Sequence, residues 1–96
     1  MITVDYTRGS GWHRLTVSGH AVYAETGRDI VCAGVSVLSC ALAGCIPNPL
    51  KKVAEDGYFA IECPRGAHSD SIFQMALTGY RQISWEHPEC VQVLEH

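Results

Sequence analysis

One histidine and one cysteine, His20 and Cys32, stand on either side of a single loop. Cys32 follows Asp29, a good helix N-cap because its carboxylate can accept a backbone N–H of the first turn. We therefore expect Cys32 in the first helical turn, where free N–H groups and the helix dipole stabilise a thiolate. With His20 as base and then acid, this thiolate is suited to attack a peptide carbonyl.

Two further residues belong to this hypothesis. The Asp29 carboxylate raises a nearby thiol pKa, so the site needs a partner that can carry positive charge, and His20 is the candidate. Ser36 lies one turn after Cys32 on the same helix face, where it can hydrogen-bond within the site or orient His20. The first-turn N–H groups can hold a developing oxyanion. The residues do not determine a third member of a triad.

A structural interpretation competes with catalysis. A cysteine in an apolar helix is more often a small core residue, and a histidine is more often structural than catalytic. Asp29 is first of all a helix cap. No role is assigned to His13, His68 or His87. The core interpretation fits the other four cysteines, which are Cys40, Cys45, Cys63 and Cys90.

The first half of the chain predicts a hairpin, a loop and a helix. Residues 2–6 alternate apolar with polar, and the alternation resumes through 15–17 after a glycine-rich turn. Residues 21–28 lack a clean period and read as a loop. The helix that follows is apolar nearly all round, so it must be covered on several sides, by a sheet and by a partner subunit. Pro47 ends it after about Cys45.

The second half predicts another hairpin, a second helix and a last strand. Gly79 lies within that helix at a cost of about 1 kcal/mol, which indicates close packing there. The order β-β-α-β-β-α-β indicates an α+β two-layer sandwich, with a mostly antiparallel sheet and two helices on one face. The expected features are a turn at Asp56-Gly57, a strand at 58–63, a helix capped by Ser69 or Asp70 and ended by His87-Pro88, and a strand at 90–93.

Composition limits the class of protein. The 96 residues make one domain, 47% of them hydrophobic and 18% charged, which is typical of a globular chain. Residues 94–96 resemble the start of a histidine tag, so we expect the domain to span 1–93. The net charge of −3 and the absence of a basic patch disfavour direct nucleic-acid binding.

The expected location is the cytoplasm. No signal peptide and no membrane-spanning segment is evident, and an odd count of five cysteines favours reduced thiols. The cysteine and histidine spacings are poor for zinc, so neither a metal nor a cofactor is expected.

The strings "GHA" at 19–21 and "DIVCAGVS" at 29–36 resemble the motif of the ribosomal-processing cysteine protease family, Prp. The resemblance implies a compact cytoplasmic bacterial protein that forms a homodimer through its helices. It implies removal of the N-terminal extension of a large-subunit ribosomal protein, number twenty-seven of the L series, by a cut after paired aromatic residues.

The resemblance also implies roles for single residues. Cys32 and His20 fall on the catalytic pair of the family, and Asp29 and Ser36 on positions of the same site. The loop between the pair is implied to move when substrate binds, and the substrate-loop residues are Ala21, Val22, Tyr23 and Gly27. Tyr23 is a candidate wall of an aromatic pocket.

Two alternatives stay open at this stage. One is a noncatalytic dimeric module that binds a ribosomal protein or an assembly factor, favoured by the apolar first helix. The other, weaker one is a redox sensor that uses Cys32, for which the motif offers no resolving cysteine.

Overall fold

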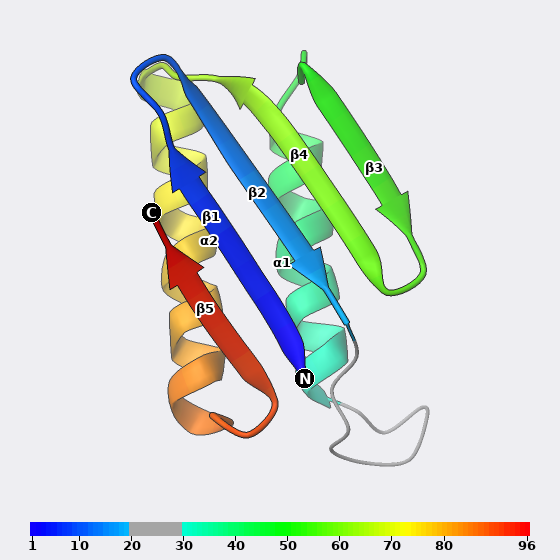
Figure 1. The fold of residues 1–96 in the computed structure, drawn as a ribbon. Helices are drawn as coiled ribbons and strands as arrows, with labels where there is room; N and C mark the ends of the chain where they lie inside the picture. Colours follow the sequence, from blue (N-terminus) through cyan, green and yellow to red (C-terminus); the bar gives the residue numbers. More distant parts are fainter. Residues whose placement is uncertain (20–29) are drawn as a thin grey trace.

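A computed structural model of the chain describes residues 1–19 and 30–96 (Figure 1). The predicted order β-β-α-β-β-α-β is confirmed. The elements are β1 (Ile2–Arg8), β2 (Trp12–Ser18), α1 (Ile30–Cys45), β3 (Lys51–Glu55), β4 (Tyr58–Pro64), α2 (Ala67–Glu86) and β5 (Val91–Glu95).

The five strands form one sheet in the order β3-β4-β2-β1-β5. Only β1 and β5 pair in parallel, and the other three pairs are antiparallel, as the sequence predicts for a mostly antiparallel sheet. The short turn at Asp56-Gly57 joins β3 to β4, with Gly57 at a φ of 76°, in the left-handed region that glycine tolerates.

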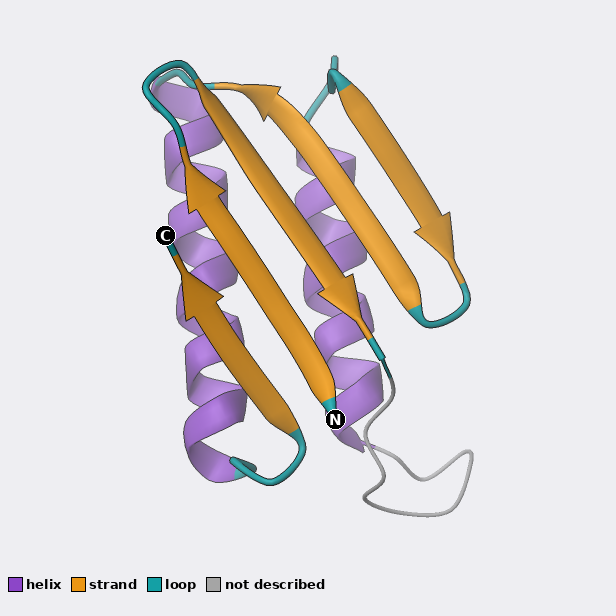
Figure 2. Cartoon of the chain, in the orientation of Figure 1, coloured by secondary structure: helices purple, strands orange, loops and turns teal. Residues whose placement is uncertain are grey.

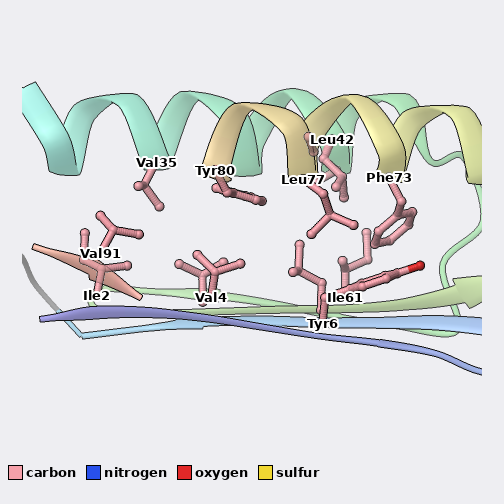
Figure 3. Packing of buried hydrophobic residues seen from close by; sticks show 14 of the residues in the cluster. Ile2, Val4, Tyr6, Val35, Leu42, Ile61, Phe73, Leu77, Tyr80 and Val91 are labelled. Carbon is pink, nitrogen blue, oxygen red and sulfur yellow. The ribbon is translucent and has the colours of Figure 1, made fainter. Parts of the chain in front are cut away.

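Both helices cover the same face of the sheet, so the α+β two-layer architecture is confirmed (Figure 2). Alternate residues of β1 and β2 point toward the helices, because successive strand residues face opposite sides. They meet the buried stripes of α1 and α2 in a single apolar layer (Figure 3). The largest fully buried members are Tyr80, Phe73, Leu15, Leu42 and Ile61.

The two helices approach closely at two glycines. A Cβ at Gly79 of α2 would lie 2.7 Å from Leu38 Cδ1 of α1, and a Cβ at Gly34 would lie 3.3 Å from Ile83 Cδ1. The close packing predicted for Gly79 is confirmed. The contact fixes the distance between the helices and hence the position of α1 above the sheet.

The start of α2 differs from the sequence prediction. The helix begins at Ala67, its N-cap is Gly66, and no side chain caps it. Asp70 lies inside the first turn and accepts hydrogen bonds from Arg65, at 3.0 and 3.3 Å. The prediction that Ser69 or Asp70 is the N-cap is wrong, because both lie inside the helix; the Asp70 carboxylate accepts the Gly66 N–H at 3.4 Å besides its bonds to side chains outside the helix.

The last strand runs beyond the predicted domain boundary at residue 93. Leu94 and Glu95 pair with β1, and the two Glu95 oxygens accept hydrogen bonds from Arg81 of α2 at 2.7 and 2.6 Å. These two residues therefore belong to the sheet in the structure.

A histidine without a predicted role lies at the centre of a buried polar network. His13 is 1% exposed and stacks on Phe73, with the ring centroids 4.3 Å apart. Its Nε2 lies 2.7 Å from Asp70 Oδ1 and its Nδ1 lies 2.6 Å from Tyr6 Oη. Hydrogen bonds, of which the one from Arg65 has the largest effect, keep the pKa of Asp70 well below its ordinary value. The ionised carboxylate only accepts, so Nε2 donates and a neutral ring accepts from the Tyr6 hydroxyl at Nδ1.

Replacing Gly79 by alanine is expected to destabilise the fold by about 1 kcal/mol. The gain in helix propensity, about 1 kcal/mol, is outweighed by the displacement of Leu38, because overpacking costs about 1–3 kcal/mol. Gly44→Ala is the matched control, since a Cβ at that helical glycine meets nothing within 4 Å. Urea unfolding measures both; a Gly79→Ala protein as stable as Gly44→Ala would contradict the close packing.

The burial of His13 is expected to make the free energy of unfolding depend on pH. Desolvation lowers the pKa of His13 below its ordinary 6.5, despite the opposing effect of Asp70. The unfolded chain therefore binds a proton at higher pH than the folded one, so the free energy of unfolding falls as pH drops below about 6.5. Thermal unfolding between pH 8 and pH 5 measures this fall. It should be shallower in His13→Gln, and an equal fall in both proteins would contradict the assignment.

Candidate active site

Cys32 is the third residue of α1, as the sequence predicts for a residue in the first turn. Its side chain is partly buried and lines a pocket of about 330 Å³. The N-terminal end of a helix is the positive end of its dipole, so the thiol lies at the positive end of α1.

Ser36 lies one turn further along α1 and lines the same pocket, so the structure brings Cys32 and Ser36 to one surface. The neighbouring stripe of the helix is buried: Val31 and Val35 enter the core, and Val35 also lines the pocket. This rotation of α1 follows from burial of its most apolar stripe, and it leaves the stripe with Cys32 and Ser36 at the side of the β3–β4 hairpin.

The sheet forms the other wall of the pocket in two rows. Val17, Phe59 and Ala54 are cross-strand partners on β2, β4 and β3, and they form an apolar row at the back. Gly19 and Gly57 line the pocket beside this row, together with Glu55, Asp56 and Tyr58. Small side chains, those of Cys32, Ser36 and Cys40, line the helix side of the pocket.

Gly19 holds the end of β2 in a fixed geometry. Its φ is 93°, its N–H donates to the carbonyl of Gly57 at 2.9 Å, and a Cβ there would overlap the backbone carbonyl of Met1. The chain is thus anchored at the pocket one residue before His20. His20, Asp29 and the predicted substrate-loop residues Ala21, Val22, Tyr23 and Gly27 lie outside the described residues.

Only two of the four cysteines that the sequence predicts as core residues are buried. Cys63 and Cys90 are buried, as expected, but Cys40 and Cys45 are exposed because they fall on helix faces that nothing in the described structure covers. Cys40 lines the pocket together with Cys32. The two are eight positions apart on one helix, about 12 Å, which is too far for a disulfide.

Several pocket residues were not identified as site residues from the sequence. Gly57 belongs to the predicted turn and Phe59 to the strand predicted at 58–63, but neither pattern indicates that a cavity lies beside them. The doublet Gly19-His20 at a strand end was the available signal for the sheet side of the site.

The described residues offer neither a metal site nor a membrane-spanning helix. Within residues 1–19 and 30–96, no group of three His, Cys, Asp or Glu side chains is placed to hold a metal ion. Neither of the described helices is long and apolar enough to cross a membrane.

Comparison with solved structures gives a match over the whole chain. An essential ribosomal processing protease Prp from S. aureus, in complex with a covalently linked product peptide, superimposes with a TM-score of 0.88 at 29% identity, covering 100% of both chains. The same protein in complex with a substrate peptide gives a TM-score of 0.79 at 28% identity, again over 100% of both chains.

Curated relatives match over shorter segments. The ribosomal processing cysteine protease Prp of Bacillus subtilis is 34% identical over 68 residues, which are 65% of this chain and 61% of the relative. Its counterpart in Mycoplasma pneumoniae is 67% identical over 24 residues, 25% of this chain and 24% of the relative. The chain thus matches less than two thirds of the length of either relative.

The sequence profile of the family described as cysteine protease Prp matches residues 1–92. This match covers both the helix that carries Cys32 and the hairpin that forms the other wall of the pocket. The protein belongs to the cysteine protease Prp family.

Proposed function

We propose that this protein is a cysteine endopeptidase that removes the N-terminal extension of a ribosomal protein precursor. The proposed substrate is the large-subunit protein number twenty-seven of the L series, cut after a pair of aromatic residues. The observation that carries the proposal is the position of Cys32 at the start of α1, in a pocket whose sheet side ends one residue before His20.

In the proposed reaction, His20 takes the Cys32 proton and the sulfur attacks the carbonyl carbon of the scissile bond. Backbone N–H groups of the first turn of α1 hold the oxyanion. The intermediate collapses, the C–N bond breaks, and the His20 imidazolium gives its proton to the leaving amine. Water, deprotonated by His20, then attacks the thioester and releases the new carboxylate, and the thiol is restored.

Other residues are proposed to support this chemistry. Ser36, one turn from Cys32 on the pocket side, is placed to hydrogen-bond a substrate or His20. Asp29 is proposed to cap α1 and to influence the charge of the pair. Residues Ala21, Val22, Tyr23 and Gly27 are proposed to contact substrate from the loop between His20 and Cys32.

The apolar back wall of the pocket supports selection of aromatic side chains. Burial of one such side chain contributes about 1.5–3 kcal/mol. Val17, Val35 and Phe59 supply the apolar surface for it. The peptide complexes of the S. aureus relative support a peptide as the ligand class.

Replacing Cys32 by alanine is expected to reduce cleavage of a precursor peptide by about 10³-fold or more, because the nucleophile is removed. Liquid chromatography of the products measures the rate. Cys45→Ala is the matched control, an exposed cysteine of the same helix outside the pocket, and its rate should stay near that of the parent.

Two outcomes would contradict the peptidase proposal. Cleavage by Cys32→Ala at the parent rate would exclude Cys32 as nucleophile. Binding of the precursor without any product, together with equal rates of Cys32 and Cys45 alkylation by iodoacetamide at pH 6, would favour the noncatalytic binding module.

We also propose that two copies associate through their helices. The outer face of the helix layer carries exposed apolar side chains: Ile30 (65%) and Val37 (68%) on α1, and Met75 (49%) and Trp85 (75%) on α2. Exposed apolar side chains that share one face of a small protein favour burial against a partner.

Val37→Asp is expected to convert a dimer into a monomer, because it places a charge in the proposed interface. Light scattering after size-exclusion chromatography measures the mass. Leu50→Asp is the matched control, since Leu50 is also 68% exposed but precedes β3, outside the helices. A monomeric parent protein, or a Val37→Asp dimer as stable as the Leu50→Asp dimer, would contradict this interface.

The proposed site of action is the cytoplasm. The five cysteines, all within the described residues, form no disulfide, which fits a reducing compartment. The substrate of the proposed reaction is a ribosomal protein, which is made in that compartment.

A further inference from the structure

A second pocket lies between α2 and the ends of β1 and β5, apart from the one beside Cys32. The last pair of β5 with β1 joins Glu95 to Tyr6, whereas β1 continues through Arg8, and Figure 1 shows β5 ending partway along α2. The pocket has a volume of about 610 Å³, a size typical of small-molecule sites. It is therefore large enough for an organic ligand, and the proposed peptidase chemistry does not use it.

Each carboxylate that lines this second pocket is already held by an arginine. Asp70 Oδ2 accepts a hydrogen bond from Arg65 at 3.0 Å, and the two Glu95 oxygens accept from Arg81 at 2.7 and 2.6 Å. Burial keeps the pKa of His13 below its ordinary value, so this lining imidazole is neutral at pH 7. These groups therefore do not call for a cation.

Arg8 supplies a positive charge that the other lining groups do not balance. Its side chain is exposed, and no carboxylate within residues 1–19 and 30–96 forms an ion pair with it. Burial raises the pKa of the Tyr6 hydroxyl and the charge of Arg8 opposes that rise, so the guanidinium acts on the interior of the pocket. Three arginines face two carboxylates there, which leaves one positive charge for a ligand to balance.

The remaining lining groups suit an anion with an apolar part. The exposed side-chain amide of Gln74 can donate an N–H to a ligand oxygen. Leu77 lies one turn further along the same stripe of α2, and with the Tyr6 ring it supplies apolar surface. A single surplus charge favours a monoanion over a phosphate dianion, and a planar carboxylate matches the fork of a guanidinium.

We propose that this second pocket binds a small monocarboxylate with an apolar body. The carboxylate lies on Arg8 and Gln74, and the apolar body packs against Leu77 and Tyr6. The site is at the other end of the sheet from Cys32, so its ligand leaves the first pocket open. A free acid and the C-terminus of a peptide present the same chemistry. The proposal does not depend on the peptidase function.

NMR titration of the isotope-labelled protein with phenylacetate tests the site through amide chemical shifts. We expect saturable shifts at Arg8, Gln74 and Leu77, and none at Cys32 or Ser36. Phenylethanol, which has a similar apolar part without the charge, should bind about ten-fold more weakly or worse. N-acetylphenylalanine separates the two sources: tighter binding than phenylacetate supports a peptide C-terminus as the ligand, and weaker binding supports a free acid.

Two pairs of variants locate the charge that binds the probe. Arg8→Gln should raise the Kd of phenylacetate about ten-fold or more, whereas Arg14→Gln, on the other face of the sheet, should leave it near the parent value. Gln74→Glu keeps the shape of the side chain and places a repelling charge in the pocket, so it should weaken binding too. Gln82→Glu is its control, an exposed glutamine of α2 outside the pocket.

Four results would overturn this site. They are the absence of saturable shifts up to the solubility limit of phenylacetate, shifts centred on Cys32, phenylethanol or phenyl phosphate binding as tightly as phenylacetate, and equal Kd values for Arg8→Gln and Arg14→Gln. Circular dichroism confirms that each variant is folded. Because the measurement is of binding alone, loss of cleavage activity would not affect it.

Discussion

Burial of one stripe of α1 against the sheet is the constraint on which the site depends. Val31, Val35 and Leu42 all enter the core, and this sets the rotation of the helix about its axis. The stripe that carries Cys32, Ser36 and Cys40 is then directed toward the β3–β4 hairpin. The contact between Gly79 and Leu38 sets the distance between α1 and α2. Apolar packing therefore determines both the rotation of α1 and its position above the sheet, and with them the position of the proposed nucleophile.

The two ends of the sheet differ in the polar groups that lie beside them. At the β1–β2 turn, His13 is buried with both ring nitrogens bonded, and Asp70 joins it to Arg65. At the other end of β2, about 20 Å away along the strand, Gly19, Gly57 and Cys32 line a pocket. A satisfied network stabilises the first end, where a second pocket is lined by Tyr6, His13 and Asp70, whereas the proposed nucleophile lines the pocket at the second end.

Local patterns were sufficient to predict most of the fold. Alternation in 2–6 and 15–17, the Asp56-Gly57 turn and the apolar stripe of α1 predicted the elements, and their order predicted the layers. The start of α2 was missed because Asp70, a good capping type, binds His13 and Arg65 instead, and such long-range partners leave no mark in local sequence. Cys40 was misassigned for the related reason that helical spacing does not reveal which face stays uncovered.

The site was predictable in part. The helix-start position of Cys32 and its proximity to Ser36 followed from spacing along one helix, and both are confirmed. The pocket walls come from cross-strand neighbours such as Val17, Phe59 and Ala54, whose register depends on the whole sheet. The pairing of Cys32 with His20 stays a prediction, because His20 lies outside the described residues.

The most direct test of the proposed mechanism is identification of the acyl-enzyme. A precursor peptide ester is mixed with the protein, the reaction is stopped with acid within its first turnover, and the digested protein is analysed by mass spectrometry. The account predicts the acyl group on the Cys32 thiol. Product formation with the acyl group on another residue, or with no acyl-enzyme under conditions where deacylation is slow, would contradict it.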